Sequence, residues 1–243
     1  MQYEVLEQIR GKILVSCQGA KDGGNPFYLP EHMLLMAKAA HAGGCAGFRA
    51  NTPPNIKIIK EFFPTIPMIG IYKIVEEGSD VYITPNMAAV DELVSLNCEI
   101  IAIDGTNRKN ARGQYGCEFI AEVKEKYPDQ IVMADLATFE EAKLCAKAGA
   151  DILATTMAGY TAESVGCTTA AFDLLKEIRQ ANLGRFIICE GKIWTVEDAD
   201  KAFESGADSI VIGKAVTSPI SITKRFVEQM KERNHEKPVL CCR

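Results

Sequence analysis

The amino-acid sequence predicts an α/β protein that closes into a (β/α)8 TIM barrel with a short N-terminal helix. Three observations carry this prediction. The chain has 243 residues, which suits one barrel domain. Short apolar runs rich in β-branched residues alternate with helical patterns, and the order of helix, small-residue turn and strand recurs along the chain. No linker interrupts residues 1–243, so a single domain is expected.

The clearest βαβ unit lies in the last third of the chain. An apolar run over Phe186–Cys189 is followed by a helical pattern over Thr195–Ser205 and a second apolar run over Ser209–Ile212. Such runs are typical of strands buried on both faces, and one helix between them gives a parallel pair with a right-handed crossover. Glu190 follows the first strand and Gly213-Lys214 follows the second, at the edge where parallel folds bind ligands.

The same pattern locates the other strands. Eight are expected, at Lys12–Cys17, Gly47–Asn51, Met68–Lys73, Glu99–Asp104, Gln130–Leu136, Asp151–Thr156, Phe186–Cys189 and Ser209–Ile212. Gly-Ala-Asp precedes the sixth and eighth strands, where glycine can end a helix in a left-handed cap. An open doubly wound sheet is the alternative, but Gln18-Gly19-Ala20 lacks the glycine-rich dinucleotide-binding pattern.

Helical patterns fill the intervals between the strands. They predict helices over Tyr3–Arg10, Pro30–His41, Pro54–Phe62, Pro85–Leu96, Gly116–Tyr127, Phe139–Ala148, Thr168–Ala181, Thr195–Ser205 and Ile220–Glu232. Pro30 suits the first turn of its helix, where a missing N–H costs no hydrogen bond. Val75–Tyr82 is expected to be an insertion, Met157–Gly166 a loop and His235–Arg243 a polar tail.

Composition argues against several kinds of partner. The formal net charge is −5 and no long Lys/Arg tract is present, so nucleic-acid binding is not expected. No apolar run approaches the roughly 18 residues that span a bilayer, and the chain start does not resemble a signal peptide, so no membrane association is expected. The nine cysteines are expected to be reduced, as in a cytoplasmic protein.

In a barrel, polar residues at the carboxyl ends of the strands converge on one pocket. Here these residues are Gln18, Arg49, Lys73, Asp104, Asp135, Thr155, Glu190 and Gly213. Each one alone has a structural explanation: Arg49 could pair with a carboxylate, and Asp135 with Lys73. A ring of several charges around one site is harder to explain by stability, because each buried charge needs a partner.

Lys73 and Glu190 are the candidate catalytic residues. A lysine in a dry pocket can act as a base or as a Schiff-base nucleophile, because burial lowers its pKa. Glu190 follows a fully apolar strand, where a carboxyl group with a raised pKa can act as an acid near neutral pH. Together, the two groups could remove a proton from one side of a carbonyl substrate and return it on the other.

Glycines after the last two strands indicate a phosphate site. Gly213-Lys214 and Glu190-Gly191-Lys192 stand where barrels usually bind phosphate, and glycine permits close approach to backbone N–H groups. His32, His41 and His235 fall on expected helices or in the tail, so no metal site is expected.

Several motifs together resemble the N-acetylmannosamine-6-phosphate 2-epimerase family. They include VSCQ at 15–18, GFRAN at 47–51, IGIYK at 69–73, IIAIDGT at 100–106, MADLAT at 133–138, TTMAGYT at 155–161, CEGK at 189–192 and VIGKAVTSP at 211–219. The resemblance runs from about Gly11 to Val227. It implies a cofactor-free barrel that interconverts N-acetylmannosamine 6-phosphate and N-acetylglucosamine 6-phosphate in sialic acid breakdown.

The resemblance also implies roles for individual residues. Lys73 would remove the C2 proton and Glu190 would deliver one to the opposite face. Asp135 would orient the lysine, and Arg49 and Gln18 would hold the sugar. Thr155, Gly191, Gly213 and Lys214 complete the expected substrate-binding set. The expected partner is a small sugar phosphate, and a homodimer is possible for barrels of this kind.

The chain departs from the family at two places. The family usually has arginine where this chain has Ser218, and this arginine is expected to help bind phosphate; Lys214 is the candidate replacement. After Lys73 the family commonly continues with Arg-Asp, whereas this chain has Ile74-Val75, so the lid over the sugar is expected to differ.

Three other functions remain open at this point. Ser218 suggests the same chemistry on an unphosphorylated or altered amino sugar. Lys73 would also suit a Schiff-base aldolase. A sugar-phosphate sensor without activity is the third, although a chain with both Lys73 and Glu190 argues against it.

Overall fold

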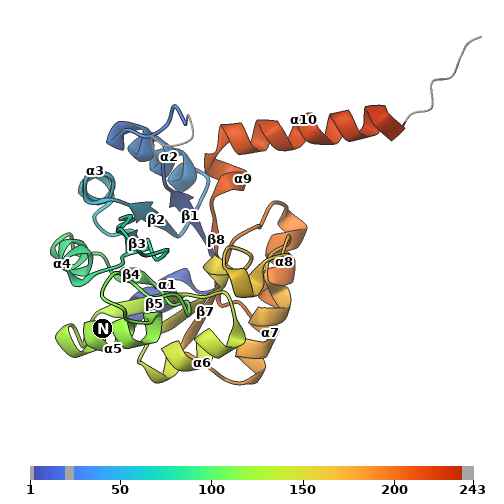
Figure 1. Ribbon diagram of the computed structural model, residues 1–243. Coiled ribbons are helices and arrows are strands. Elements are labelled where there is room, and N and C mark those ends of the chain that lie inside the picture. The colour runs from blue at the N-terminus through green and yellow to red at the C-terminus, as the bar shows by residue number, and fades with distance from the viewer. Residues whose placement is uncertain (1–2, 20–24, 237–243) are drawn as a thin grey trace, which may run out of the picture.

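The computed structural model describes residues 3–19 and 25–236, which form a closed barrel of eight parallel strands with helices around it (Figure 1). The strands follow one another in chain order, and β1 pairs with β8 to close the ring. Their bounds are β1 Ile13–Cys17, β2 Gly47–Asn51, β3 Met68–Ile71, β4 Ile100–Asp104, β5 Ile131–Asp135, β6 Ile152–Ala154, β7 Phe186–Glu190 and β8 Ser209–Ile212. The predicted (β/α)8 barrel is therefore confirmed.

Helices cover the outside of the barrel and connect its strands. They are α1 Glu4–Ile9, α2 Pro30–Ala42, α3 Pro53–Phe62, α4 Met87–Ser95, α5 Gly116–Lys126, α6 Phe139–Lys147, α7 Phe172–Gln180, α8 Val196–Glu204, α9 Lys214–Thr217 and α10 Pro219–Glu236. Two 3₁₀ turns, η2 Thr155–Met157 and η3 Ala162–Ser164, lie between β6 and α7.

Three predicted helix boundaries are corrected. The helix predicted from Pro85 begins at Met87, because the Asn86 side chain caps α4 by accepting the Ala89 N–H at 2.9 Å. The helix predicted from Thr168 begins at Phe172. The predicted polar tail begins too early, because α10 continues to Glu236; the rest of that tail lies outside the described residues.

Two apolar layers hold the barrel together. Side chains that point inward from the strands fill its interior, among them Leu14, Ile69, Ile100, Met133, Phe186 and Val211. Leu6 and Ile9 of α1 pack into the same cluster and close one end of the barrel. A second cluster lies between the outward faces of the strands and the surrounding helices. Polar side chains line the opposite end, at the carboxyl ends of the strands.

The predicted insertion after β3 folds into a short hairpin. Lys73 forms an antiparallel bridge with Ile83, and the Ile74 N–H donates to the Tyr82 carbonyl at 3.0 Å. Lys73 therefore lies beyond β3 rather than within it, and the hairpin fixes its backbone. The Lys73 N–H also donates to the Asn51 side chain at 2.9 Å.

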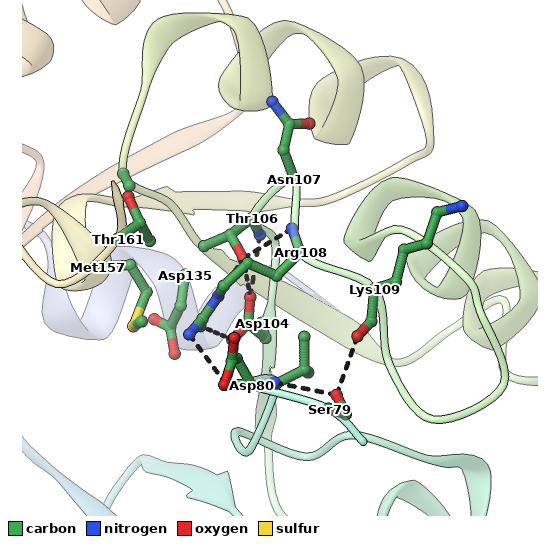
Figure 2. Close-up of polar contacts among 12 residues, drawn as sticks. Ser79, Asp80, Asp104, Thr106, Asn107, Arg108, Lys109, Asp135, Met157 and Thr161 are labelled. Carbon is green, nitrogen blue, oxygen red and sulfur yellow. Dashed lines mark hydrogen bonds and ion pairs between the residues drawn. The ribbon is translucent and has the colours of Figure 1, made fainter. Parts of the chain in front are cut away.

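Arg108, from the loop after β4, ties this hairpin to the barrel (Figure 2). Its guanidinium donates to the Asp104 carboxylate at 2.5 Å and to the Asp80 carbonyl at 2.9 Å. Ser79 adds a bond from its hydroxyl to the Lys109 carbonyl at 2.9 Å. The loops after β3 and β4 thus form one continuous rim above the strands.

Helix α10 extends away from the barrel instead of packing along it (Figure 1). Phe226, Val227 and Met230 on this helix are largely exposed, and Phe226 has 65% of its surface accessible. Within residues 3–19 and 25–236, no helix combines the length and apolar character that crossing a bilayer requires.

Candidate active site

A cavity of about 480 Å³ opens at the carboxyl ends of the strands. Most of the predicted site residues line it, namely Gln18, Arg49, Lys73, Glu190, Gly191, Gly213 and Lys214. They come from the ends of β1, β2, β3, β7 and β8, which lie far apart in the sequence. Closure of the barrel brings them to one place, as predicted from the strand-end pattern.

Arg49 is the central charge of the site and is almost completely buried. Its guanidinium pairs with both carboxylate oxygens of Asp135, at 3.0 and 2.6 Å, and with Glu190 Oε2 at 2.7 Å. Burial opposes the charged form of Arg49, but the two carboxylates outweigh this effect and raise its pKa. Arg49 is therefore a fixed cation that holds two acidic side chains.

Glu190 ends β7 and has 12% of its side chain exposed. Burial raises the pKa of Glu190 to about 7, and the neighbouring Asp135 charge adds to the rise. Arg49 and Lys73 act in the opposite direction. The carboxyl group can therefore gain or lose a proton near neutral pH, as an acid–base catalyst must.

Lys73 reaches into the same cavity from the base of the hairpin. Its side chain is exposed to solvent, so the dry pocket expected for this lysine from the sequence is not found. Partial desolvation by neighbouring protein atoms, together with the Arg49 charge, lowers the pKa of Lys73, while Glu190 and Asp135 partly restore it. The ammonium lies 5.9 Å from the centre of the Tyr82 ring. The lowered pKa makes the neutral amine easier to form here than on an unperturbed lysine.

Three residues predicted at strand ends lie outside the cavity lining. Asp135 is completely buried and is hydrogen-bonded to Arg49 and Thr156. Thr155 exchanges hydrogen bonds of 3.2 and 3.3 Å with the Glu190 backbone, which fixes β7 beside β6. Asp104 bonds Thr106 and Arg108.

Basic side chains gather on the β7–β8 side of the cavity. Lys192 and Lys214 both line it, and burial together with the Lys214 charge lowers the pKa of Lys192. The Lys192 ammonium donates to the Ala158 carbonyl and lies 4.6 Å from the Tyr160 ring centre. A Cβ atom on Gly159 would lie 2.5 Å from the Cys167 carbonyl oxygen, and the φ of 82° at this position disfavours other residues, so the loop after β6 requires glycine there. This side of the cavity suits an anion.

Several lining residues were not predicted from the sequence. They are Ser16, Asn25, Tyr82, Thr156, Tyr160, Trp194 and Thr217. Thr156 lies in the 3₁₀ turn η2 just after β6, and the strand pattern does not predict which side chain of this turn faces the cavity. Tyr82, Tyr160 and Trp194 belong to loops, and their approach to the cavity depends on hairpin and turn geometry that composition does not encode.

No cluster of three or more His, Cys, Asp or Glu side chains that could hold a metal ion occurs in the described part of the chain. The cavity lining itself supplies a lysine, a carboxyl group and surrounding hydrogen-bond donors. An amine and a carboxyl group on one cavity can move a proton onto and off a carbon next to a carbonyl group.

A family model described as "Putative N-acetylmannosamine-6-phosphate epimerase" matches residues 33–232. The chain is 41% identical to a relative named as the corresponding 2-epimerase in Caldanaerobacter subterraneus, over 97% of this chain and 98% of that protein. A relative of the same name in Shouchella clausii is also 41% identical, over 94% of this chain and 100% of its own length.

Solved structures show the same likeness. The N-acetylmannosamine-6-phosphate 2-epimerase from Clostridium perfringens matches with a TM-score of 0.86 and 38% identity, over 93% of this chain and 96% of that chain. Thiamine phosphate pyrophosphorylase from Pyrococcus furiosus matches with a TM-score of 0.61 at 14% identity, which shows a shared fold alone.

Proposed function

Because the chain belongs to the N-acetylmannosamine-6-phosphate 2-epimerase family, we propose that it interconverts N-acetylmannosamine 6-phosphate and N-acetylglucosamine 6-phosphate. The protein is thus an isomerase that acts at C2 of an amino sugar. One observation carries the assignment of its groups: an amine with a lowered pKa and a carboxyl group with a raised pKa line the same cavity. We assign them as the base and the acid.

The reaction needs only proton transfer. In the open-chain sugar, the C1 carbonyl acidifies the hydrogen on C2, and the neutral Lys73 amine takes this proton to leave an enolate. Glu190 then donates its proton to C2 from the opposite face, which inverts the configuration. Lys73 ends protonated and Glu190 ionised, which is the state that the reverse reaction uses. Positioned acid and base groups each contribute about 10²–10⁴-fold, and the scheme uses no cofactor.

Arg49 and Gln18 are proposed to hold the sugar beside these groups. Gln18 lines the cavity and donates from its amide nitrogen to Ser16 Oγ at 2.8 Å, so its amide oxygen is the group proposed to accept from a sugar hydroxyl. Arg49 also keeps the acid in place, since its guanidinium is bonded to Glu190.

The phosphate is proposed to bind on the β7–β8 side, at Gly191, Gly213 and Lys214. Lys214→Ala is expected to raise KM for the sugar phosphate about 10–100-fold, because a hydrogen bond to a charged group of this kind is lost. Ser218→Ala is the matched control and should change KM by less than about threefold. Steady-state kinetics on both variants checks this. Equal small effects would mean that backbone N–H groups alone hold the phosphate.

A plot of kcat/KM against pH is expected to be bell-shaped for both the forward and the reverse reaction. The productive enzyme holds one proton between Lys73 and Glu190. As the pH falls through about 7, Glu190 gains a proton while Lys73 keeps its own, and no base remains. As the pH rises through the lowered pKa of Lys73, below 10.5, the last proton leaves and no acid remains. A rate that stays constant from about pH 5 to 7 would contradict this assignment.

The substrate is tested by NMR of the purified protein in deuterated water. Each of the two epimers is supplied with and without the 6-phosphate, and both interconversion and deuterium at C2 are followed. The proposal predicts rapid interconversion of the phosphorylated pair with deuterium at C2. Turnover of the unphosphorylated sugars alone would reassign the substrate, as the residue Ser218 at the cavity suggested. Absence of turnover and exchange would remove the function.

We also propose a homodimer, a cytoplasmic location and a role in sialic acid breakdown. The exposed apolar residues Phe226, Val227 and Met230 on α10 would be covered by a second copy of the chain. Seven cysteines in the described residues are unpaired, as in a reducing compartment. Light scattering of the purified protein measures the mass directly, and a monomer at micromolar concentration would reject the dimer.

A further inference from the structure

Four polar atoms form a closed ring beneath the cavity. Arg49 Nη1 donates to Asp135 Oδ1 at 3.0 Å and to Glu190 Oε2 at 2.7 Å. Thr156 Oγ1 faces the same two oxygens from the other side, at 2.5 Å from Asp135 and 3.4 Å from Glu190. Two donors thus share two acceptors, and Thr156 is the member whose proton can turn by rotation about one bond.

The fold places Thr156 there through the turn η2. This turn follows β6 directly, so Thr155 and Thr156 point in different directions. Thr155 bonds the backbone of Glu190, whereas Thr156 is half-buried and lines the cavity. The Thr156 hydroxyl therefore stands between a permanently buried carboxylate and the proposed catalytic acid.

A threonine hydroxyl has one proton, and the distances decide where it lies. With the structure as described, the Asp135 oxygen is nearer by almost an ångström and receives the proton. When Glu190 has lost its proton, Glu190 Oε2 carries the same charge as the Asp135 oxygen, and an approach of Oε2 toward Thr156 makes it the competing acceptor. We propose that Thr156 is a positioning residue whose hydroxyl turns from Asp135 to Glu190 when Glu190 gives up its proton, and turns back when Glu190 regains it.

This arrangement also distinguishes the two oxygens of Glu190. Oε2 contacts Arg49 and Thr156, while Oε1 has no hydrogen-bond partner among the described residues. Oε1 is therefore the oxygen that exchanges a proton with C2. The other charged groups that act on Glu190 are Asp135 and Lys73, and Lys192 and Lys214 line the same cavity.

The test rests on the proposed function and compares Thr156→Val with Thr156→Ser. Valine keeps the shape but cannot donate, so the ionised form of Glu190 loses a donor. The acid limb of kcat/KM should then move to higher pH by about one unit, kcat should fall about 10–100-fold, and KM should change less than about threefold. Thr156→Ser should restore the position of the acid limb and the value of kcat. Thr138→Val, which removes the cap of α6, is the control for lost stability and should leave the limb in place.

A readout without turnover separates this inference from the proposed function. Carbon-13 NMR of labelled glutamate, with Glu190→Gln to assign the signal, gives the titration of Glu190 in substrate-free protein. An upward shift in Thr156→Val, reversed in Thr156→Ser, supports the ring even if the substrate differs. An unchanged Glu190 titration in Thr156→Val would overturn the inference while leaving the epimerase untouched. A serine variant as impaired as valine would also overturn it, because packing of the methyl group would then be the cause.

Discussion

Lys73→Ala is expected to lower kcat for epimerisation by about 10²–10⁴-fold in both directions, because the base that takes the C2 proton is removed. The protein should remain folded. Among the described residues the Lys73 ammonium makes no ion pair, so the backbone bonds of the hairpin are expected to hold without it. Coupled assays of kcat and a thermal melt of the variant check both statements.

Lys57→Ala is the control for the loss of one lysine. Lys57 lies on the exposed face of α3, away from the cavity, and this variant should keep the activity of the unmodified protein. A rate for Lys73→Ala similar to that of the control would reject the assignment of the base. Borohydride trapping of substrate on Lys73 would reject it too, since a Schiff-base aldolase forms that adduct and direct proton abstraction does not.

Glu190→Gln is expected to lower kcat by a similar factor, about 10²–10⁴-fold, because an amide cannot deliver the proton that inverts C2. The substitution keeps the shape and leaves a carbonyl oxygen that can still accept from Arg49. Asp135 continues to neutralise the buried guanidinium, so unfolding should require a similar temperature. Measurement of kcat alongside a melting curve distinguishes lost chemistry from lost structure.

Glu92→Gln, an exposed glutamate on α4, serves as the matched control and should have normal kinetics. If Glu190→Gln kept normal turnover, the acid would have to be another group on the cavity. If the variant failed to fold, Glu190→Asp would decide, since it keeps the charge while moving the carboxyl group back by one methylene.

The barrel itself could be predicted from the sequence because its strands are unusually regular. Runs such as Phe186–Cys189 and Ser209–Ile212 are apolar on both faces, and the structure buries them nearly completely. Glycines after the helices, such as Gly149 and Gly206, have positive φ values of 97° and 106°, as the expected left-handed caps require. Apolar runs and glycine caps depend on neighbouring residues alone, so they can be recognised in a single sequence.

The site residues that strand ends carry could be predicted from the sequence. The site residues that turns carry could not. Arg49 and Glu190 belong to strands, so their direction follows from the barrel. The strand-end pattern predicts Thr155 at the cavity, whereas its neighbour Thr156 lines it, because β6 ends at Ala154 and a 3₁₀ turn follows. A shift of one residue reverses which side chain faces the site, and no local signal marks this turn.

The partner of Asp135 could not be predicted from the sequence for a related reason. The sequence shows a carboxylate, a lysine and an arginine at strand ends, and any pair among them is chemically reasonable. The bidentate contact of Arg49 with Asp135 forms because β2 and β5 both direct these side chains toward the barrel interior. Lys73, carried by the hairpin beyond β3, sits farther out toward the cavity.

Deuterium exchange at C2 in the two catalytic variants is the most direct test of the central claim that Lys73 and Glu190 act on opposite faces of one carbon. Each epimer presents its C2 hydrogen to one of the two groups. The Glu190→Gln variant keeps Lys73 and should therefore exchange only the C2 hydrogen of the epimer that faces Lys73. The Lys73→Ala variant keeps Glu190 and should exchange only that of the other epimer. Neither variant should interconvert the two epimers. If both variants exchange the same epimer, or either one exchanges both, the two-sided mechanism is contradicted.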